Sequence, residues 1–83
     1  MKNYNNFDLE THVNQIKHSL EKEGLSSLAI KLAEAVAAGA TGTEIHFRVR
    51  GALLDMKNNK NISPSTLSLI KETVAVVNRK IKV

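Results

Sequence analysis

The feature that most constrains the fold is a helical spacing of apolar residues, which occurs in four separate segments of the chain. In the first segment, Leu9, Val13, Ile16 and Leu20 recur every three or four residues, so they share one stripe of an α-helix. The last segment has the same spacing in Leu67, Ile70, Val74, Val77 and Ile81. The sequence therefore predicts four amphipathic helices and no strand.

Turn and capping residues bound these helices. Gly24 suits the left-handed turn that ends a helix, Gly39 is a natural stop, and Ser63-Pro64 supplies a cap followed by a first-turn proline. The predicted helices span residues 8–23, 26–38, 42–57 and 64–81. Because short loops join them, we expect an all-α fold: a compact antiparallel three- to four-helix bundle forming a single domain over residues 1–83. The first helix is the most polar, so we expect it to lie more loosely on the other three.

The second and third helices carry more specific expectations. Ser26 or Ser27 is expected to cap the second helix, and Thr41 with Glu44 predicts a capping box at the start of the third. Alanines on the other faces of the second helix predict close helix–helix packing; they are Ala33, Ala37 and Ala38.

The composition excludes several classes of protein. The chain has no cysteine, which rules out a disulfide framework, a thiolate zinc site and a cysteine nucleophile. No uncharged run approaches the ~20 apolar residues that cross a bilayer, and the N-terminus lacks an apolar signal core. We therefore expect a cytoplasmic domain without membrane contact.

Charge is unevenly distributed along the chain. Residues 1–42 carry four Lys or Arg against five Asp or Glu, whereas residues 43–83 carry eight against three, which together give the net charge of +4. Such asymmetry is typical of a surface for an acidic protein or a nucleic acid, and equally of a solvated lysine-rich tail.

No catalytic or metal-binding constellation emerges. His12 and His18 are six residues apart on one helix and point about 120° away from one another, and His46 has no carboxylate three or four residues later. The glycine-rich run 39–43 precedes a helix but lacks the lysine and the preceding strand of a phosphate-binding loop. We expect no enzyme activity, no metal and no cofactor.

The third helix is the most informative segment because it has two apolar faces. The core face is predicted to hold Ile45, Val49, Ala52, Leu53 and Met56. Phe47, Gly51 and Leu54 lie almost opposite, with Arg50 and Lys57 along one border. Gly51 costs about 0.8–1 kcal/mol of helix stability relative to alanine, which suggests that its small size serves a close backbone approach.

Two interpretations of the second apolar face remain open. In one, the third helix is central and packs on both sides. In the other, an exposed aromatic residue flanked by arginine forms a protein-binding patch, a composition favoured at interfaces. The candidate partner-binding residues are then His46, Phe47, Arg50, Leu54 and Lys57, with Arg79 and Lys82 as further basic candidates. The same patch could instead make a homodimer.

A nucleic-acid-binding alternative rests on a different pattern. Ala35, Gly39 and Ile45 match the small-residue, turn-glycine and apolar spacing of a helix-turn-helix, whose second helix would offer Arg48 and Arg50 to DNA. Against it, Arg48 stands where that motif usually has an apolar core residue.

Residues 24–56, GLSSLAIKLAEAVAAGATGTEIHFRVRGALLDM, resemble a group of short bacterial helical proteins, mainly in the run 39–45 and in the later Ser63-Pro64. Proteins of this kind are similar to the immunity proteins of polymorphic or contact-dependent toxin systems, which bind and inhibit a cognate toxin domain. The resemblance implies an antitoxin function, and no binding residues carry over from it. The basic charge of this chain differs from that of many nuclease inhibitors, which are acidic.

Overall fold

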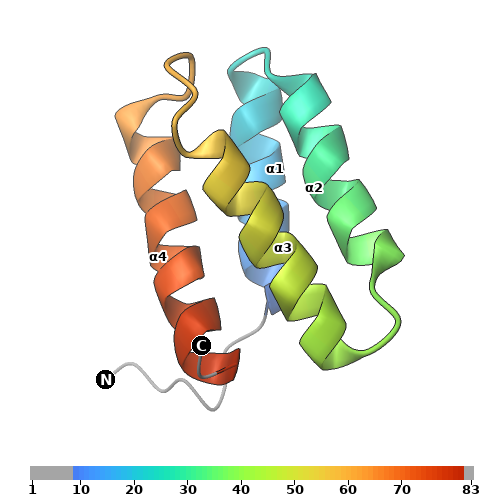
Figure 1. The fold of residues 1–83 in the computed structure, drawn as a ribbon. Helices are drawn as coiled ribbons and strands as arrows, with labels where there is room; N and C mark the ends of the chain where they lie inside the picture. The colour runs from blue at the N-terminus through green and yellow to red at the C-terminus, as the bar shows by residue number, and fades with distance from the viewer. Residues whose placement is uncertain (1–8, 82–83) are drawn as a thin grey trace.

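The computed structural model describes residues 9–81, and this part of the chain is an all-α bundle. Its helices are α1 (Leu9–Lys22), α2 (Ser26–Ala38), α3 (Gly42–Met56) and α4 (Pro64–Ile81). They run alternately up and down, and each packs against two neighbours, so that α1 closes a ring by contacting α4 (Figure 1). This arrangement confirms the predicted fold class. No helix within residues 9–81 is long and apolar enough to span a membrane.

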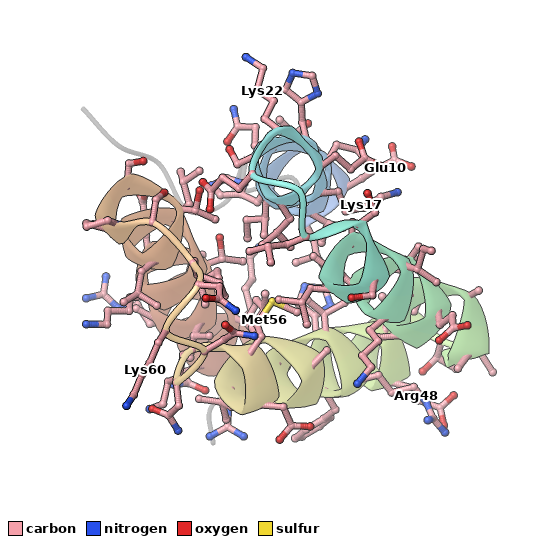
Figure 2. The ribbon with its side chains drawn as sticks, turned by 90° about the horizontal axis from the view of Figure 1, so that it is seen from above. Glu10, Lys17, Lys22, Arg48, Met56 and Lys60 are labelled. Carbon is pink, nitrogen blue, oxygen red and sulfur yellow. The ribbon has the colours of Figure 1, made fainter. Side chains whose placement is uncertain are left out.

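The core lies at the centre of the ring, and all four helices contribute to it. Seen along the bundle, the helices occupy four corners, with Met56 pointing inward and Arg48 and Lys60 pointing away (Figure 2). The buried apolar residues are Val13, Ile16, Leu20, Ala29, Leu32, Val49, Leu53, Met56, Ile62, Ile70, Val76 and Val77. Burial of these side chains is the main source of stability in a chain of this size.

The expectation of a loosely attached first helix is wrong. Ile16 and Leu20 of α1 are completely buried, and α1 contacts both α2 and α4. A narrow apolar stripe suffices because it faces the centre of the ring, where α2 and α4 meet it from two sides. The polar remainder of α1 faces outward, as the labelled Glu10 and Lys22 show (Figure 2).

The start of α2 also differs from the prediction. Leu25 occupies the N-cap position and no side chain caps the helix, so neither Ser26 nor Ser27 has the expected role. Gly24, just before it, has a φ of 78°, the left-handed conformation predicted for the end of α1. The Leu25 N–H donates a hydrogen bond to the carbonyl of Leu20 at 2.8 Å, so Leu25 forms part of the turn that ends α1.

The capping arrangement of α3 forms with one change. Thr41 Oγ1 accepts a hydrogen bond from the Glu44 N–H at 3.2 Å, as predicted. Glu44 Oε1, however, accepts from the N–H of Ala40 at 2.6 Å rather than from that of Thr41. The carboxylate therefore ties the turn before the helix to its first residues.

The tight contact between α2 and α3 is made by a glycine rather than by the alanines. Ala37 and Ala38 are exposed and Ala33 is half-buried. A Cβ atom on Gly39 would lie 2.8 Å from both Cα and N of Ile45, closer than real Cβ atoms approach. Gly39 has an ordinary φ of −80°, so space and not backbone conformation requires glycine there.

The buried face of α4 is rotated from the one predicted. The residues it buries are Thr66, Ile70, Thr73, Val76 and Val77, whereas Leu67, Val74 and Ile81 are only partly buried. Threonine can face the core because its hydroxyl is satisfied: Thr73 Oγ1 donates to the Leu69 carbonyl at 2.8 Å, four residues back on the same helix. As a result, Val74 is partly exposed on the side of α4 that borders α3.

Candidate partner-binding surface on α3

The outward side of α3 carries an apolar strip that the other helices do not cover. Phe47 is 47% exposed and is, with Ile30, one of two large exposed apolar side chains among the described residues. Gly51 and Leu54 follow at spacings of four and three residues and are half-buried. These three residues, here called the α3 outer face, lie opposite the buried Val49 and Leu53. The interpretation in which both sides of α3 are sealed within the bundle is therefore wrong for Phe47.

Gly51 is not required by the packing of the bundle. A Cβ atom placed on it would meet nothing within 4 Å. The predicted close approach is thus not made by any described part of this chain, although glycine in a helix interior still lowers stability by about 0.8–1 kcal/mol relative to alanine. Above Gly51 the backbone of α3 is open to a molecule from outside.

Two of the predicted basic residues border the α3 outer face. Arg50 is half-buried, and its Nε donates a hydrogen bond to Asn78 Oδ1 of α4 at 2.5 Å. Lys57 is exposed and stands at the C-terminal cap of α3. The bond to Asn78 holds the Arg50 side chain along the junction of α3 and α4.

The structure places His46 elsewhere. Its Nδ1 lies 2.6 Å from the Gly42 carbonyl oxygen, and its ring lines cavities together with Leu9 and, at the end of α4, Lys80 and Ile81. It therefore does not join Phe47 on the outer face. Of the further basic candidates, Arg79 is exposed on α4 and Lys82 lies outside the described residues.

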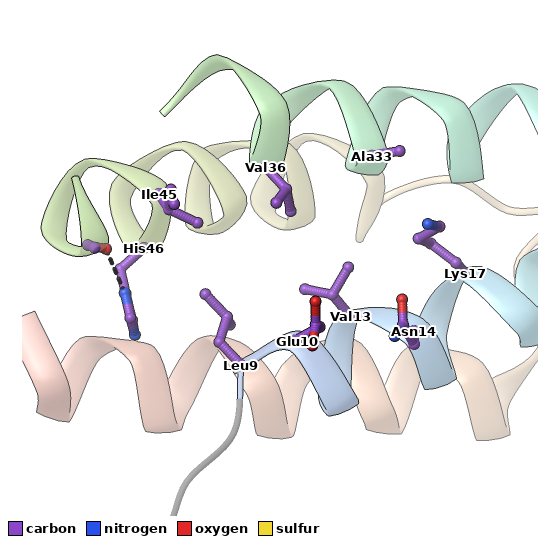
Figure 3. A pocket seen from close by; sticks show the side chains of 10 residues that line it. Leu9, Glu10, Val13, Asn14, Lys17, Ala33, Val36, Ile45 and His46 are labelled. Atoms are coloured by element: carbon purple, nitrogen blue, oxygen red, sulfur yellow. Dashed lines mark hydrogen bonds between the residues drawn. The ribbon is translucent and has the colours of Figure 1, made fainter. Parts of the chain in front are cut away.

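A larger groove is also separate from the α3 outer face. It has a volume of about 510 Å³ and lies between α1 and α2, beside the start of α3 (Figure 3). Apolar side chains form most of its lining, and its polar residues include Glu10, Asn14 and Lys17 of α1 as well as His46. Because its rim mixes both signs of charge, the groove does not define a class of ligand.

Sequence reasoning missed one exposed apolar residue, Ile30 of α2, which is 57% exposed. A signal was present: Ile30 precedes the buried Leu32 by two residues, which is about 200° around a helix. It has no aromatic or basic neighbour on its own helix within one turn except Lys31. We treat it as an isolated apolar side chain, which is common on protein surfaces.

The arginines offered by the helix-turn-helix alternative both have partners within the chain. Arg48 lies 3.7 Å from Glu44 in an exposed ion pair one turn apart, and Arg50 bonds to Asn78. The contact of Gly39 with Ile45 does match the spacing of that motif. On the side of α3 that faces away from the core, however, the prominent exposed side chain is the apolar Phe47 and not a basic residue.

Residues 9–81 contain no group of three or more histidine and carboxylate side chains placed to hold a metal ion. The pKa of Glu23 is lowered by hydrogen bonds from the Thr66 hydroxyl and then from the side chain and backbone of Ser63. These three groups belong to Ser63 and to the first turn of α4, so capping of that helix explains the lowered pKa of Glu23.

Comparison with protein-family models, with curated proteins and with solved structures finds no match for this chain. The choice of function therefore depends on the geometry of its own residues.

Proposed function

We propose that this chain is a non-enzymatic protein-binding module that uses the α3 outer face as its contact surface. The observation that carries the proposal is the position of Phe47, an aromatic side chain that is nearly half exposed, whereas the other large apolar side chains of the described residues, apart from Ile30, are buried or partly buried. Aromatic residues flanked by arginine are enriched at protein interfaces, where they fill a pocket of the partner.

The cost of Gly51 to helix stability supports the same proposal. Its presence lowers helix stability, and no described contact within the chain compensates for this. A partner that packs closely against the α3 backbone would provide the compensating contact, since glycine admits the nearest approach between two chains.

The specific role we propose is that of an immunity or antitoxin protein that neutralises a bacterial toxin in the cytoplasm by direct binding. The resemblance of residues 24–56 to small helical immunity proteins supports this role. In such a complex the apolar centre excludes water, while Arg50 and Lys57 pair with acidic groups of the toxin.

A growth assay tests this role. The gene next to the one for this chain is expressed alone and then together with it; we expect arrest in the first case and growth in the second. The double variant Phe47→Ala/Arg50→Ala should lose protection, and Ile30→Ala, which shortens the other exposed apolar residue, should keep it. Melting curves of both variants check that they fold. A harmless neighbour, or full protection by the folded double variant, contradicts the proposal.

The second candidate, a helix-turn-helix-like nucleic-acid-binding protein, is favoured by the Gly39–Ile45 contact between α2 and α3. It predicts binding to duplex DNA at low salt with a steep loss of affinity as salt rises, because counterions are released. Titration of a labelled duplex at two salt concentrations measures this, and no binding at low salt removes the candidate.

A further inference from the structure

The α3 outer face continues into a groove between α3 and α4. The groove has a volume of about 270 Å³ and shares Leu54 with the outer face. Its lining residues are Leu54, Lys57, Ile70, Lys71, Val74, Ala75 and Asn78. Together, the groove and the outer face make one surface that extends over two helices.

This groove exists because of how α4 is rotated. Thr66 and Thr73 take core positions with their hydroxyls hydrogen-bonded, which turns the apolar Val74 toward α3 and leaves it partly exposed. Ala75 beside it is exposed and too small to fill the space. The floor of the groove is therefore apolar although it lies at the surface.

The charge around the groove has one sign. Lys57 and Lys71 are the ionisable residues that line it, and both are exposed. Arg50 stands beside it through its bond to Asn78, which is itself a lining residue. The acidic residue nearest in sequence on α4 is Glu72, which follows Lys71 and points about 100° further around the helix.

The groove on the other side of α3, between α2 and α3, is different. Its charged lining residues are Lys31, Glu34 and Asp55, so both signs are present. A cationic rim around an apolar floor thus distinguishes the α4 side of α3 from the α2 side.

Building on the proposed function, we infer that this surface binds an amphipathic helix with acidic borders from the partner protein. Phe47 to Lys57 covers about 15 Å of helix, or nearly three turns, which matches a short helix laid along the groove. The apolar side of that helix covers Phe47, Leu54 and Val74, and its acidic borders meet the three basic residues. Gly51 leaves room for its backbone.

A second copy of this chain and a nucleic acid would each fit this surface less well than an acidic amphipathic helix. In a symmetric homodimer the same patch meets itself, so Lys57 and Lys71 would face a second pair of lysines. A nucleic acid would satisfy these charges, but its phosphates would leave the apolar residues between them uncovered.

The experiment uses two synthetic amphipathic peptides of about 14 residues, identical in their leucine stripe but bordered by glutamate in one and by lysine in the other. Each is titrated into the ¹⁵N-labelled full chain, and amide shifts are followed by NMR. We expect the acidic peptide to bind at least about tenfold more tightly, with this preference shrinking as salt is added. The shifted amides should include Leu54, Lys71 and Val74.

Charge-reversal variants sharpen the test. Lys57→Glu/Lys71→Glu should switch the preference to the basic peptide, whereas the matched control Lys22→Glu/Lys31→Glu, with the same charge change on exposed residues of α1 and α2, should not. Equal binding of both peptides, no binding of the acidic one, or an unchanged preference in the first variant overturns the inference. So does displacement of the acidic peptide by a DNA duplex, or dimerisation through these residues.

Failure of the inference and failure of the proposed function give different results. If the double variant Phe47→Ala/Arg50→Ala still loses growth protection while charge reversal has no effect on peptide choice, the α3 outer face binds a partner but not an acidic helix. If the double variant keeps protection, the surface itself is wrongly assigned.

Discussion

Glu23, in the turn that follows α1, caps α4 through Ser63, which lies forty residues later in the chain. Its Oε1 accepts a hydrogen bond from the Ser63 backbone N–H at 3.0 Å, and its Oε2 accepts from the Ser63 hydroxyl at 2.7 Å and from Thr66 Oγ1. Ser63 Oγ in turn accepts from the Thr66 N–H at 3.3 Å, as its own capping position predicts. One carboxylate thus joins the first and last helices at one end of the bundle.

This relationship predicts a pH dependence of stability. Because the pKa of Glu23 is lowered in the folded chain, its stabilisation is fully present above the ordinary carboxyl pKa and is lost as the pH falls through the lowered value. Glu23→Gln should therefore melt at a lower temperature than the parent chain at pH 7, and the gap should close toward pH 3. The matched control is Glu21→Gln, which removes an exposed carboxylate from α1. A gap of the same size at both pH values contradicts the prediction.

Gly39→Ala is predicted to destabilise the bundle. The new Cβ would lie 2.8 Å from backbone atoms of Ile45, which cannot move without shifting α3. We expect a loss of about 1–3 kcal/mol in the free energy of unfolding, measured by denaturant titration. Gly42→Ala, three residues later, adds a Cβ with nothing within 4 Å and should change stability by no more than about 0.5 kcal/mol. Equal losses in the two variants would mean that close contact is not the cause.

Gly51→Ala is predicted to have the opposite effect. Since no atom lies within 4 Å of the added Cβ, the variant gains only helix propensity, about 0.8–1 kcal/mol. The same denaturant titration should show a higher midpoint with an unchanged slope. A lower midpoint would show that the space above Gly51 is occupied in solution.

Much of the fold could be predicted because apolar periodicity and turn residues act locally. The all-α class followed from them, and the described helices begin and end within one residue of the expected bounds where both are described. The rotation of α4 could not be predicted in this way. Thr66 is buried because its hydroxyl finds Glu23, a partner forty-three residues away, and no pattern within α4 reveals that bond.

Part of the candidate surface could also be predicted from the sequence, because that part depends on spacing within one helix. The spacing of Phe47, Gly51 and Leu54 on a helix is visible in the sequence, whereas the contribution of Lys71 and Val74 depends on which side of α4 meets α3. His46 illustrates the converse, because nearness to Phe47 in sequence did not place it on the same side of the helix.

A pair of truncations tests whether Phe47 belongs to the surface. Phe47→Ala removes a side chain that is nearly half exposed, so its cost in unfolding free energy should stay below about 1 kcal/mol. Leu53→Ala removes a completely buried one and should cost about 2–5 kcal/mol. Thermal or denaturant unfolding of the two variants side by side measures the difference. Comparable losses would place Phe47 in the core.

The Gly39–Ile45 contact also bears on how a partner would arrive. With backbone pressed against backbone at the junction of α2 and α3, α3 has little freedom to roll about its axis, and the Arg50–Asn78 bond restrains it from the other side. A partner would then bind by rigid-body association, and this chain would lose little conformational entropy on binding. The lifetime of the complex would be governed by the fit of Phe47 in its pocket rather than by any refolding of the bundle.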